Sequence, residues 1–207
     1  MNRTRIFGAL FLTLVLVVTG SLAARAAGED PPAIGAAAPE FALKCTGGGT
    51  HSLADYKGKI VVLEWTNPGC PVVVRHYKDG LMPAAQKAAK EKGVVWVAVN
   101  STNAAHKDFK EPEALRAAYA DWKPAYSTLL MDADGKTGKA YGAKTTPHMF
   151  VIDAEGKVVY NGAIDDDTSG KNPERTNHVL AAIDELLAGK PVSVSTTKPY
   201  GCSVKYE

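Results

Sequence analysis

The sequence has three cysteines among its 207 residues, and the surroundings of Cys70 suggest the most chemistry. This residue stands in "VVLEWTNPGCPVVVRHYKDG", residues 61–80, where an apolar run breaks at Asn-Pro-Gly and a helical pattern follows Pro71. Proline suits the first position of a helix, which makes Cys70 the expected N-cap. Unpaired N–H groups and the helix dipole favour a thiolate there, so we predict a nucleophile. A buried inert thiol is the alternative. Arg75 and His76, about one turn further on, are expected to add positive charge.

A second thiol near the C-terminus could complete the chemistry. Cys202 lies in "KPYGCSVKYE", on a Ser/Thr/Lys-rich segment that starts at Lys190 and is predicted to be extended and mobile. At about 3.3 Å per residue this segment can cross a small domain. We therefore predict that Cys202 resolves intermediates formed on Cys70. A static disulfide that holds the tail, or an exposed thiol, are the alternatives. Tyr200 and Tyr206 either dock the tail or are ordinary surface aromatics.

The other candidate side chains are open to plainer interpretations. Cys45 ends an N-terminal strand and is expected to be a small buried hydrophobe or a spare thiol, unless it pairs with Cys202. His148 could face Cys70, where a Cys–His pair would support a thiolate or bind a soft metal, or it is simply hydrogen-bonded. The remaining histidines show no metal-ligand spacing. For the acidic run "IDDD", 164–167, we expect a solvated turn, with calcium binding as the alternative.

The N-terminus has the pattern of an export signal. Arg3 and Arg5 precede an apolar block over residues 6–18, and Ala24-Arg25-Ala26 offers small residues for cleavage. The block is short for a membrane span, which needs about 20 apolar residues. We therefore predict a cleaved signal over residues 1–26 and a periplasmic or secreted protein. An uncleaved N-terminal membrane anchor is the alternative.

Charge and cysteine count limit the classes of function. The net charge of +2 depends on the three arginines of the predicted signal, and without them 21 basic residues face 22 acidic ones. A nearly neutral protein gives no electrostatic reason to expect nucleic acid as a partner. An oxidising compartment allows cysteines to pair, and three of them leave at least one thiol free or paired outside the chain.

The apolar pattern predicts alternating strands and helices. Strands are expected at 39–45, 60–65, 94–100, 126–132, 148–153 and 158–164. Helices are expected after Pro71, interrupted at Asp79-Gly80 and Pro83, from Pro112 to Trp122, and from Pro173 with Asn172 as its cap. This order indicates an α/β fold with a mixed central sheet, parallel at its centre and carrying an antiparallel hairpin edge. We divide the chain into a signal (1–26), a loose linker (27–38), one domain (39–189) and a tail (190–207).

Two stretches together resemble the thioredoxin-like redoxins, the group that joins periplasmic thiol–disulfide proteins and peroxiredoxin-like, alkyl hydroperoxide reductase-like proteins. They are "GKIVVLEWTNPGCP" and "LLMDADGKTGKAYGAKTTPHMFVIDAEGKVVYNGAI". The resemblance covers about Ile34 to Leu187 and implies a thioredoxin fold with an N-terminal hairpin. It also implies that Cys70 is the nucleophile and that Thr146 and a cis Pro147 lie against its sulfur.

The sequence departs from the patterns of this group at three places. Val73 stands where thioredoxin-type sites have the second cysteine of Cys-x-x-Cys, so no resolving thiol lies nearby in sequence. Asn67 holds the place where peroxiredoxins usually have a threonine, and Thr146-Pro147 replaces their arginine. These departures leave peroxide and disulfide substrates both open.

We predict an exported thiol oxidoreductase in which Cys70 attacks a peroxide oxygen or a disulfide sulfur. Cys202 then resolves the product, and a thioredoxin-like protein or a small thiol returns the electrons. Sulfur carries this chemistry, so no cofactor or metal is expected, and neither nucleic acid nor membrane is an expected partner after signal cleavage. The alternative is a non-catalytic thioredoxin-fold protein that uses Cys70 to bind a metal or a partner.

Overall fold

The computed structural model describes residues 31–206, so the predicted export signal lies outside the described part of the chain. In chain order its elements are β1 (Ala42–Cys45), β2 (Thr50–Ser52), the 3-10 helix η1 (Leu53–Tyr56), β3 (Val61–Trp65), α1 (Pro71–Lys78), α2 (Leu81–Glu91), β4 (Val95–Asn100), α3 (Pro112–Ala120), β5 (Thr128–Met131), α4 (Lys136–Tyr141), β6 (Thr145–Thr146), β7 (His148–Ile152), β8 (Val158–Gly162), α5 (His178–Leu187) and β9 (Cys202–Ser203).

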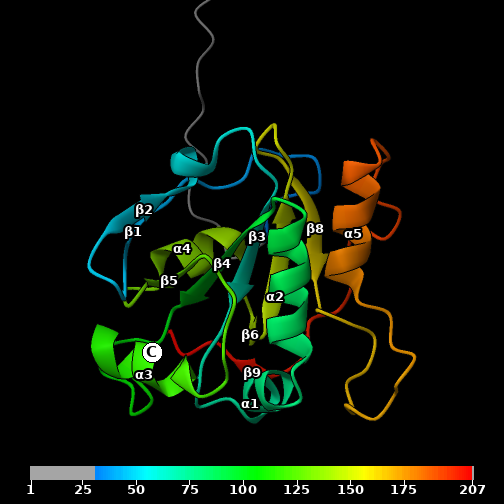
Figure 1. Ribbon diagram of the computed structural model, residues 1–207. Helices are drawn as coiled ribbons and strands as arrows, with labels where there is room; N and C mark the ends of the chain where they lie inside the picture. The colour runs from blue at the N-terminus through cyan, green and yellow to red at the C-terminus, as the bar shows by residue number, and fades with distance from the viewer. Residues whose placement is uncertain (1–30, 207) are drawn as a thin grey trace, which may run out of the picture.

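A seven-stranded mixed sheet lies at the centre, with the strand order β2-β1-β5-β4-β3-β7-β8 (Figure 1). Strands β3, β4 and β5 are parallel neighbours, whereas β7 pairs antiparallel with both β3 and β8. The predicted mixed α/β sheet is therefore confirmed. Its parallel part is smaller than the alternation of helices and strands suggested, because the β7–β8 hairpin joins β3 antiparallel.

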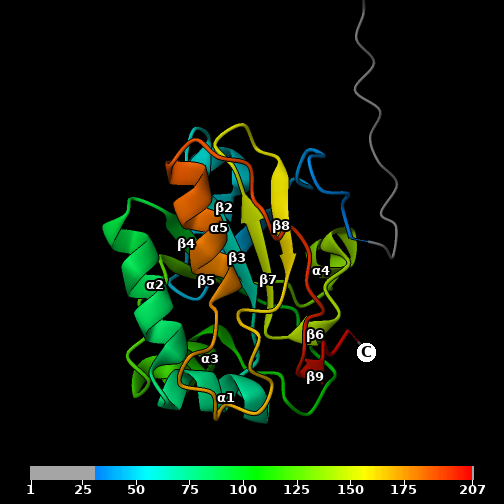
Figure 2. The same cartoon turned by 90° about the vertical axis from the view of Figure 1, so that its right-hand side faces the viewer.

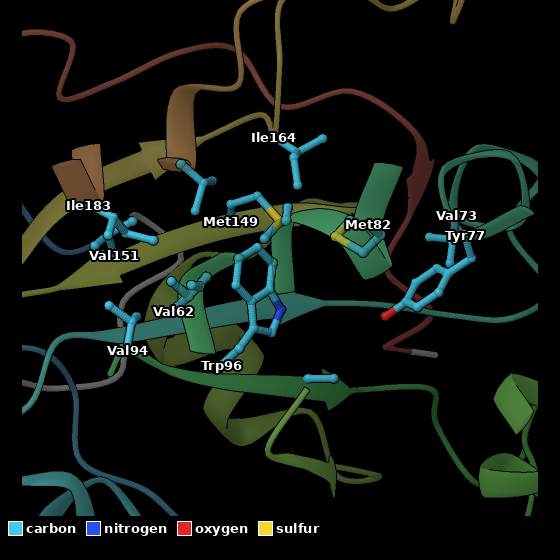
Figure 3. Packing of buried hydrophobic residues seen from close by; sticks show 14 of the residues in the cluster. Val62, Val73, Tyr77, Met82, Val94, Trp96, Met149, Val151, Ile164 and Ile183 are labelled. Atoms are coloured by element: carbon cyan, nitrogen blue, oxygen red, sulfur yellow. The ribbon is translucent and has the colours of Figure 1, made fainter. Parts of the chain in front are cut away.

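Alternate residues of the central strands build two cores. On one face, Val62, Trp96 and Met149 pack against side chains of α1, α2, α3 and α5, including Val73 and Tyr77 (Figure 3). The opposite face packs against α4 and the N-terminal segment. Helices thus cover both faces of the sheet (Figures 1 and 2). Burial on both sides is the physical reason for the apolar runs in β3 and β4.

The helices agree with the prediction in part. The split helix is confirmed: α1 ends at Lys78, and Gly80, with φ 77°, turns the chain into α2. The last helix begins later than expected, because the side chain of Asn177 accepts a hydrogen bond from Leu180 N and caps α5. Asn172 instead donates its N–H to Asp167 Oδ2 within a loop. The short helices α4 and η1 were not predicted.

Both ends of the described chain are attached to the domain. Residues 35–38, expected to be loose, hydrogen-bond to the β7–β8 hairpin through Gly35 N–Val158 O (2.8 Å) and Ala38 N–Gly156 O (2.9 Å). The tail after α5 runs beside β8 and then crosses to β6, where β9 forms a two-stranded pair (Figure 2). No helix within residues 31–206 has the length and apolar character that crossing a membrane requires.

Candidate functional site

Cys70 lies where the sequence predicts it, between the end of β3 and the start of α1. It is the N-cap of α1, and Pro71 opens the helix. Its backbone N–H bonds to Asn67 O at 3.0 Å, which closes the turn that the Asn-Pro-Gly break indicated. The residue is 2% exposed, and its thiol donates a hydrogen bond to Thr146 O at 3.0 Å. A lone cysteine is thus held at a helix N-terminus, against a backbone carbonyl from a distant segment.

The carbonyl comes from a proline turn that the resemblance implied. The Thr146–Pro147 peptide bond is cis, and Thr146 is buried beside Cys70. The structure therefore brings together Cys70, Pro71, Thr146 and Pro147, as the quoted motifs implied.

The tail brings Cys202 to the same point. Strands β6 and β9 pair antiparallel, and Cys202 is the register partner of Thr146. All three cysteines are free thiols, and the side chain of Cys202 contacts that of Cys70. The tail was predicted to be extended, as it is here, and also mobile; backbone pairing with β6 and side-chain contacts hold it against the domain.

Two tyrosines anchor the tail on either side of Cys202. The Tyr200 hydroxyl contacts Asp165 and His76. The Tyr206 hydroxyl donates to Ala143 O at 2.7 Å, and its ring lies so close to Gly138 that a Cβ there would meet the Tyr206 oxygen at 2.5 Å. Docking is therefore the correct one of the two interpretations given to these aromatics.

The two thiols have different acidities. Burial raises the pKa of Cys70, but hydrogen bonds from Cys202 and from the Val73 N–H at the start of α1 outweigh it, so that the pKa lies below that of an ordinary thiol. Burial and the neighbouring Cys70 raise the pKa of Cys202 to about 11. Cys70 is therefore the more acidic thiol of the pair, and Cys202 keeps its proton to higher pH.

Arg75 and His76 of α1 were expected to place positive charge near the Cys70 sulfur, and neither does so. Arg75 donates to Thr168 O at 3.1 Å and lies against Gly170, in the loop after β8. Burial and the nearby arginine charges lower the pKa of His76 to about 4, so this histidine is neutral at pH 7. The positive end of α1 and hydrogen bonds replace the cationic side chains that the sequence indicated.

His148 has the plainer of its two predicted roles. Its Nε2 lies 2.7 Å from Asn161 Oδ1, and its Nδ1 accepts a hydrogen bond from Lys144 N at 3.1 Å. Its ring lies tilted against that of Phe150, with centroids 4.6 Å apart, and Phe150 belongs to the core on the other face of the sheet from Cys70. With both nitrogens engaged, His148 supports the fold around the proline turn.

The acidic run at 164–167 was predicted to be a solvated turn, and this is wrong for two of its members. Asp165 and Asp167 are buried, and Arg175 lies near both carboxylates at about 4 Å. Asp167 accepts hydrogen bonds from the backbone N–H groups of residues 169, 170 and 172. Asp165 contacts Tyr200 of the tail. Asp167 therefore holds the loop of residues 167–172 together, and Asp165 binds this region to the tail.

Cys45 lies at the end of β1, paired with Leu130 of β5 and partly exposed. Burial raises its pKa, but hydrogen bonds from Gly49, Gly47 and Thr128 give a value below that of an ordinary thiol. Its thiol is a second potential nucleophile, separate from the Cys70–Cys202 pair.

A buried carboxyl group beside the site was not predicted. Glu64 in β3 is fully buried, and its oxygens accept hydrogen bonds from Tyr77 OH, Gln86 Nε2 and Trp96 Nε1 at 2.8–3.0 Å. Burial raises its pKa despite these donors. Burial raises the pKa of the Tyr119 phenol, and the charges of Glu64 and Cys70 raise it further. The signal was present in the sequence: an acidic residue inside a strand that is apolar on both faces.

One cavity of about 190 Å³ opens onto both thiols. It is lined by Asn67, Gly69, Cys70, His106, Lys107, Asp108, Cys202 and Lys205. A small thiol, a disulfide or a peroxide could reach the Cys70 sulfur through it. Within residues 31–206, no group of three or more His, Cys, Asp and Glu side chains is arranged to hold a metal ion.

The fold and the thiol pair define a thioredoxin-like oxidoreductase, and comparison with known proteins agrees with this class. The family model described as Redoxin matches residues 33–180, so the chain belongs to the Redoxin family. It is 32% identical over 128 residues to the thiol-disulfide oxidoreductase ResA of Geobacillus thermodenitrificans, which covers 61% of this chain and 67% of that protein.

Solved structures show the same fold. A hypothetical protein of Sinorhizobium meliloti superposes with a TM-score of 0.76 at 28% identity, over 85% of this chain and 96% of that one. The thioredoxin domain of a thiol-disulfide oxidoreductase from Bacteroides vulgatus gives a TM-score of 0.50 at 26% identity, over 63% and 88%.

Proposed function

We propose that this protein is an exported thiol–disulfide oxidoreductase that uses Cys70 as nucleophile and Cys202 as resolving thiol. The observation that carries the proposal is the β6–β9 pair, which sets Cys202 opposite Thr146 while Thr146 O binds the Cys70 thiol. The name of the relative ResA supports disulfide exchange as the reaction.

The first step forms a mixed disulfide. The Cys70 thiolate attacks one sulfur of a substrate disulfide, and the other sulfur leaves as a thiolate that takes a proton from solvent. The α1 N-terminus and the hydrogen bond from Cys202 stabilise the attacking thiolate. The cavity lined by both cysteines gives the substrate a path to this sulfur.

The second step uses the tail. Once Cys70 is neutral in a mixed disulfide, the thiolate charge that raised the pKa of Cys202 is gone, so Cys202 loses its proton more readily. Its thiolate attacks the Cys70 sulfur, the substrate's second thiolate leaves, and a Cys70–Cys202 disulfide remains. The substrate has gained two electrons, and an external reductant, either a thioredoxin-like dithiol protein or two molecules of a small thiol, then supplies two electrons that reduce the enzyme disulfide.

Disulfide is favoured over peroxide as substrate by the charges around the sulfur. Peroxiredoxin-type chemistry uses an arginine beside the thiolate, and Arg75, the arginine of α1, turns toward Thr168. Steady-state assays with hydrogen peroxide and with oxidised glutathione, run side by side, test this preference. Faster turnover with peroxide would reverse it.

Peptide mapping tests the pair itself. After one equivalent of oxidised glutathione, non-reducing mass spectrometry of the parent should show a peptide that links Cys70 to Cys202. Cys45→Ser, the matched control, should give the same link, whereas Cys202→Ser should trap glutathione on Cys70. A parent protein with no Cys70–Cys202 peptide would contradict the mechanism.

Export is supported by the basic, apolar and small-residue order of residues 1–26. Intact-mass measurement of the protein from its native host tests it. The expected mass begins near Ala27, and a mass that retains residues 1–26 would indicate an N-terminal anchor.

A further inference from the structure

The tail reaches Cys70 through a crossing that is very tight. Gly201 has φ 136°, and a Cβ at this residue would lie 2.1 Å from Thr146 O. The backbone of the tail therefore passes directly over the carbonyl that binds the Cys70 thiol. A crossing this close fixes the height of the tail above the site, while the β6–β9 register and the Tyr206 contact restrain the tail from Cys202 onward.

The Tyr200 hydroxyl restrains the tail on the other side of the thiol, two residues before Cys202. It donates to the Asp165 carboxylate and lies 3.3 Å from His76 Nε2 and 3.2 Å from Asp167 O. Its ring stands edge-on to the His76 ring, with centroids 5.8 Å apart and an interplanar angle of 79°. The phenol is therefore held by both its polar and its apolar parts.

The partners of Tyr200 belong to the elements that hold Cys70. His76 is in α1, the helix that Cys70 caps, and it is 1% exposed. Asp165 is equally buried, in the loop that also receives Arg75 of α1. If α1 shifted, His76 and Asp165 would move with it and would carry Tyr200 along. The distance between the two thiols would therefore change little.

We propose that Tyr200 is a positioning residue for the thiol exchange: through Asp165 and His76 it holds Cys202 at the distance and direction that attack on Cys70 requires. This inference rests on the proposed function, since it assumes that Cys202 resolves Cys70. Tyr200 acts by raising the effective concentration of one thiol at the other, and it touches no reacting atom.

The test measures that effective concentration. Reduced parent is equilibrated with glutathione buffers, in which one oxidised glutathione takes two electrons from the Cys70–Cys202 pair and becomes two reduced glutathiones. Tyr200→Phe should lower the effective concentration about tenfold, the size expected for loss of one hydrogen bond to a charged group. Tyr56→Phe removes a hydroxyl that contacts His51 in the N-terminal part and should leave the value unchanged.

A second readout separates positioning from a general loss of structure. In a Cys202→Ala background, where residue 202 can no longer donate to the Cys70 thiolate, the rate at which oxidised glutathione modifies Cys70 should not fall when Tyr200→Phe is added, because the first step then needs no tail alignment. Asp165→Asn should lower the effective concentration in the same direction. The double variant should lower the effective concentration by less than the two single effects combined, because both substitutions break the same Tyr200–Asp165 contact.

Three results would overturn the inference: an unchanged effective concentration in Tyr200→Phe, an equal fall in the first step, or full additivity with Asp165→Asn. If the parent itself forms no Cys70–Cys202 disulfide, the proposed function fails as well. If the parent forms the disulfide and Tyr200→Phe matches it, only the positioning role is lost.

Discussion

Cys202 stands directly opposite Thr146 in the β6–β9 pair, so one residue of a two-residue strand binds the Cys70 thiol and pairs with the residue that carries the second thiol. The carbonyl of Thr146 accepts a hydrogen bond from the Cys70 thiol, and the backbone of Thr146 pairs with the tail at Cys202. A Cys-x-x-Cys site carries both sulfurs on one helix. Here the second sulfur comes from a segment 132 residues further along the chain, delivered by backbone pairing at the proline turn.

Gly201→Ala should release the tail. The new Cβ would overlap Thr146 O at 2.1 Å, and φ 136° is unfavourable for any residue with a side chain. We expect a loss of about 1–3 kcal/mol in the free energy of unfolding and a clear fall in the yield of the Cys70–Cys202 peptide after oxidation. Denaturant unfolding and non-reducing peptide mapping measure the two effects.

Gly189→Ala is the matched control for this substitution. Gly189 also has a positive φ, 68°, but nothing lies within 4 Å of a Cβ built there. It should lose some stability from backbone strain and keep the normal yield of the disulfide. Equal yields from both variants would show that the close crossing over Thr146 is not needed to bring the sulfurs together.

Alkylation across pH should show Cys70 as the more acidic thiol of the pair. Hydrogen bonds from Cys202 and from the start of α1 lower its pKa, whereas the pKa of Cys202 is raised to about 11. In a Cys45→Ser background, the Cys70 rate should rise with a midpoint below 9, the value for a free thiol, and Cys202 should follow at higher pH. Residue-resolved mass spectrometry gives both curves.

Removing the partner thiol should move the Cys70 curve. In Cys202→Ala no side chain donates from that position, so the midpoint for Cys70 should shift upward, and Cys202→Ser should lie between, since a hydroxyl can still donate. A Cys70 midpoint that stays the same in Cys202→Ala would mean that the helix terminus alone sets its acidity.

The sequence was sufficient for the fold and for half of the site. Continuous apolar runs identified the buried strands, and Pro71 after an apolar run placed Cys70 at the start of a helix. The cis proline turn came from resemblance. These features are local, since each depends on a few consecutive residues and on the elements next to them.

The rest depends on contacts between distant segments, which periodicity does not report. The tail is held where Gly201 packs against Thr146, and Asp165 is covered where Tyr200 contacts it. The residues next to these positions in the sequence do not indicate either contact. A helix start at Asn172-Pro173 was a reasonable expectation from capping preference. It failed because Asp167 uses the Asn172 N–H to close a loop, and Asn177 then caps the helix.

His148 should make the protein less stable in acid. Burial lowers its pKa to about 4 from an ordinary value of 6.5. Between pH 6.5 and pH 4 the histidine is therefore protonated in the unfolded chain and neutral in the folded protein. Stability should therefore be complete above pH 6.5 and fall as the pH drops toward 4, by up to about 3 kcal/mol from this residue. His148→Gln should flatten that part of the profile, and urea unfolding at a series of pH values measures it. A variant that keeps the parental slope between pH 6.5 and 4 would assign the acid sensitivity to other groups, such as His76, whose pKa is lowered in the same way.

Glu64→Gln should stabilise the protein at neutral pH. The carboxyl is fully buried in β3, and burial raises its pKa above the ordinary value of 4.5. The folded state therefore holds a proton that the unfolded chain releases, and the parent loses stability as the pH rises from about 4.5 to the folded pKa. Glutamine keeps the shape and can still accept from Trp96 and Gln86, while its amide can donate to the Tyr77 oxygen.

The expected gain at pH 7 is about 1–3 kcal/mol in the free energy of unfolding, shrinking to little at pH 4, where the parent's Glu64 is also uncharged. Glu155→Gln, on the exposed β7–β8 turn, is the matched control and should change stability at neither pH. Chemical unfolding of the three proteins at pH 4 and pH 7 gives the comparison. If Glu64→Gln is instead less stable than the parent at pH 7, the three donors around this carboxylate outweigh its desolvation. The buried charge would then contribute to the stability of the core beneath α1.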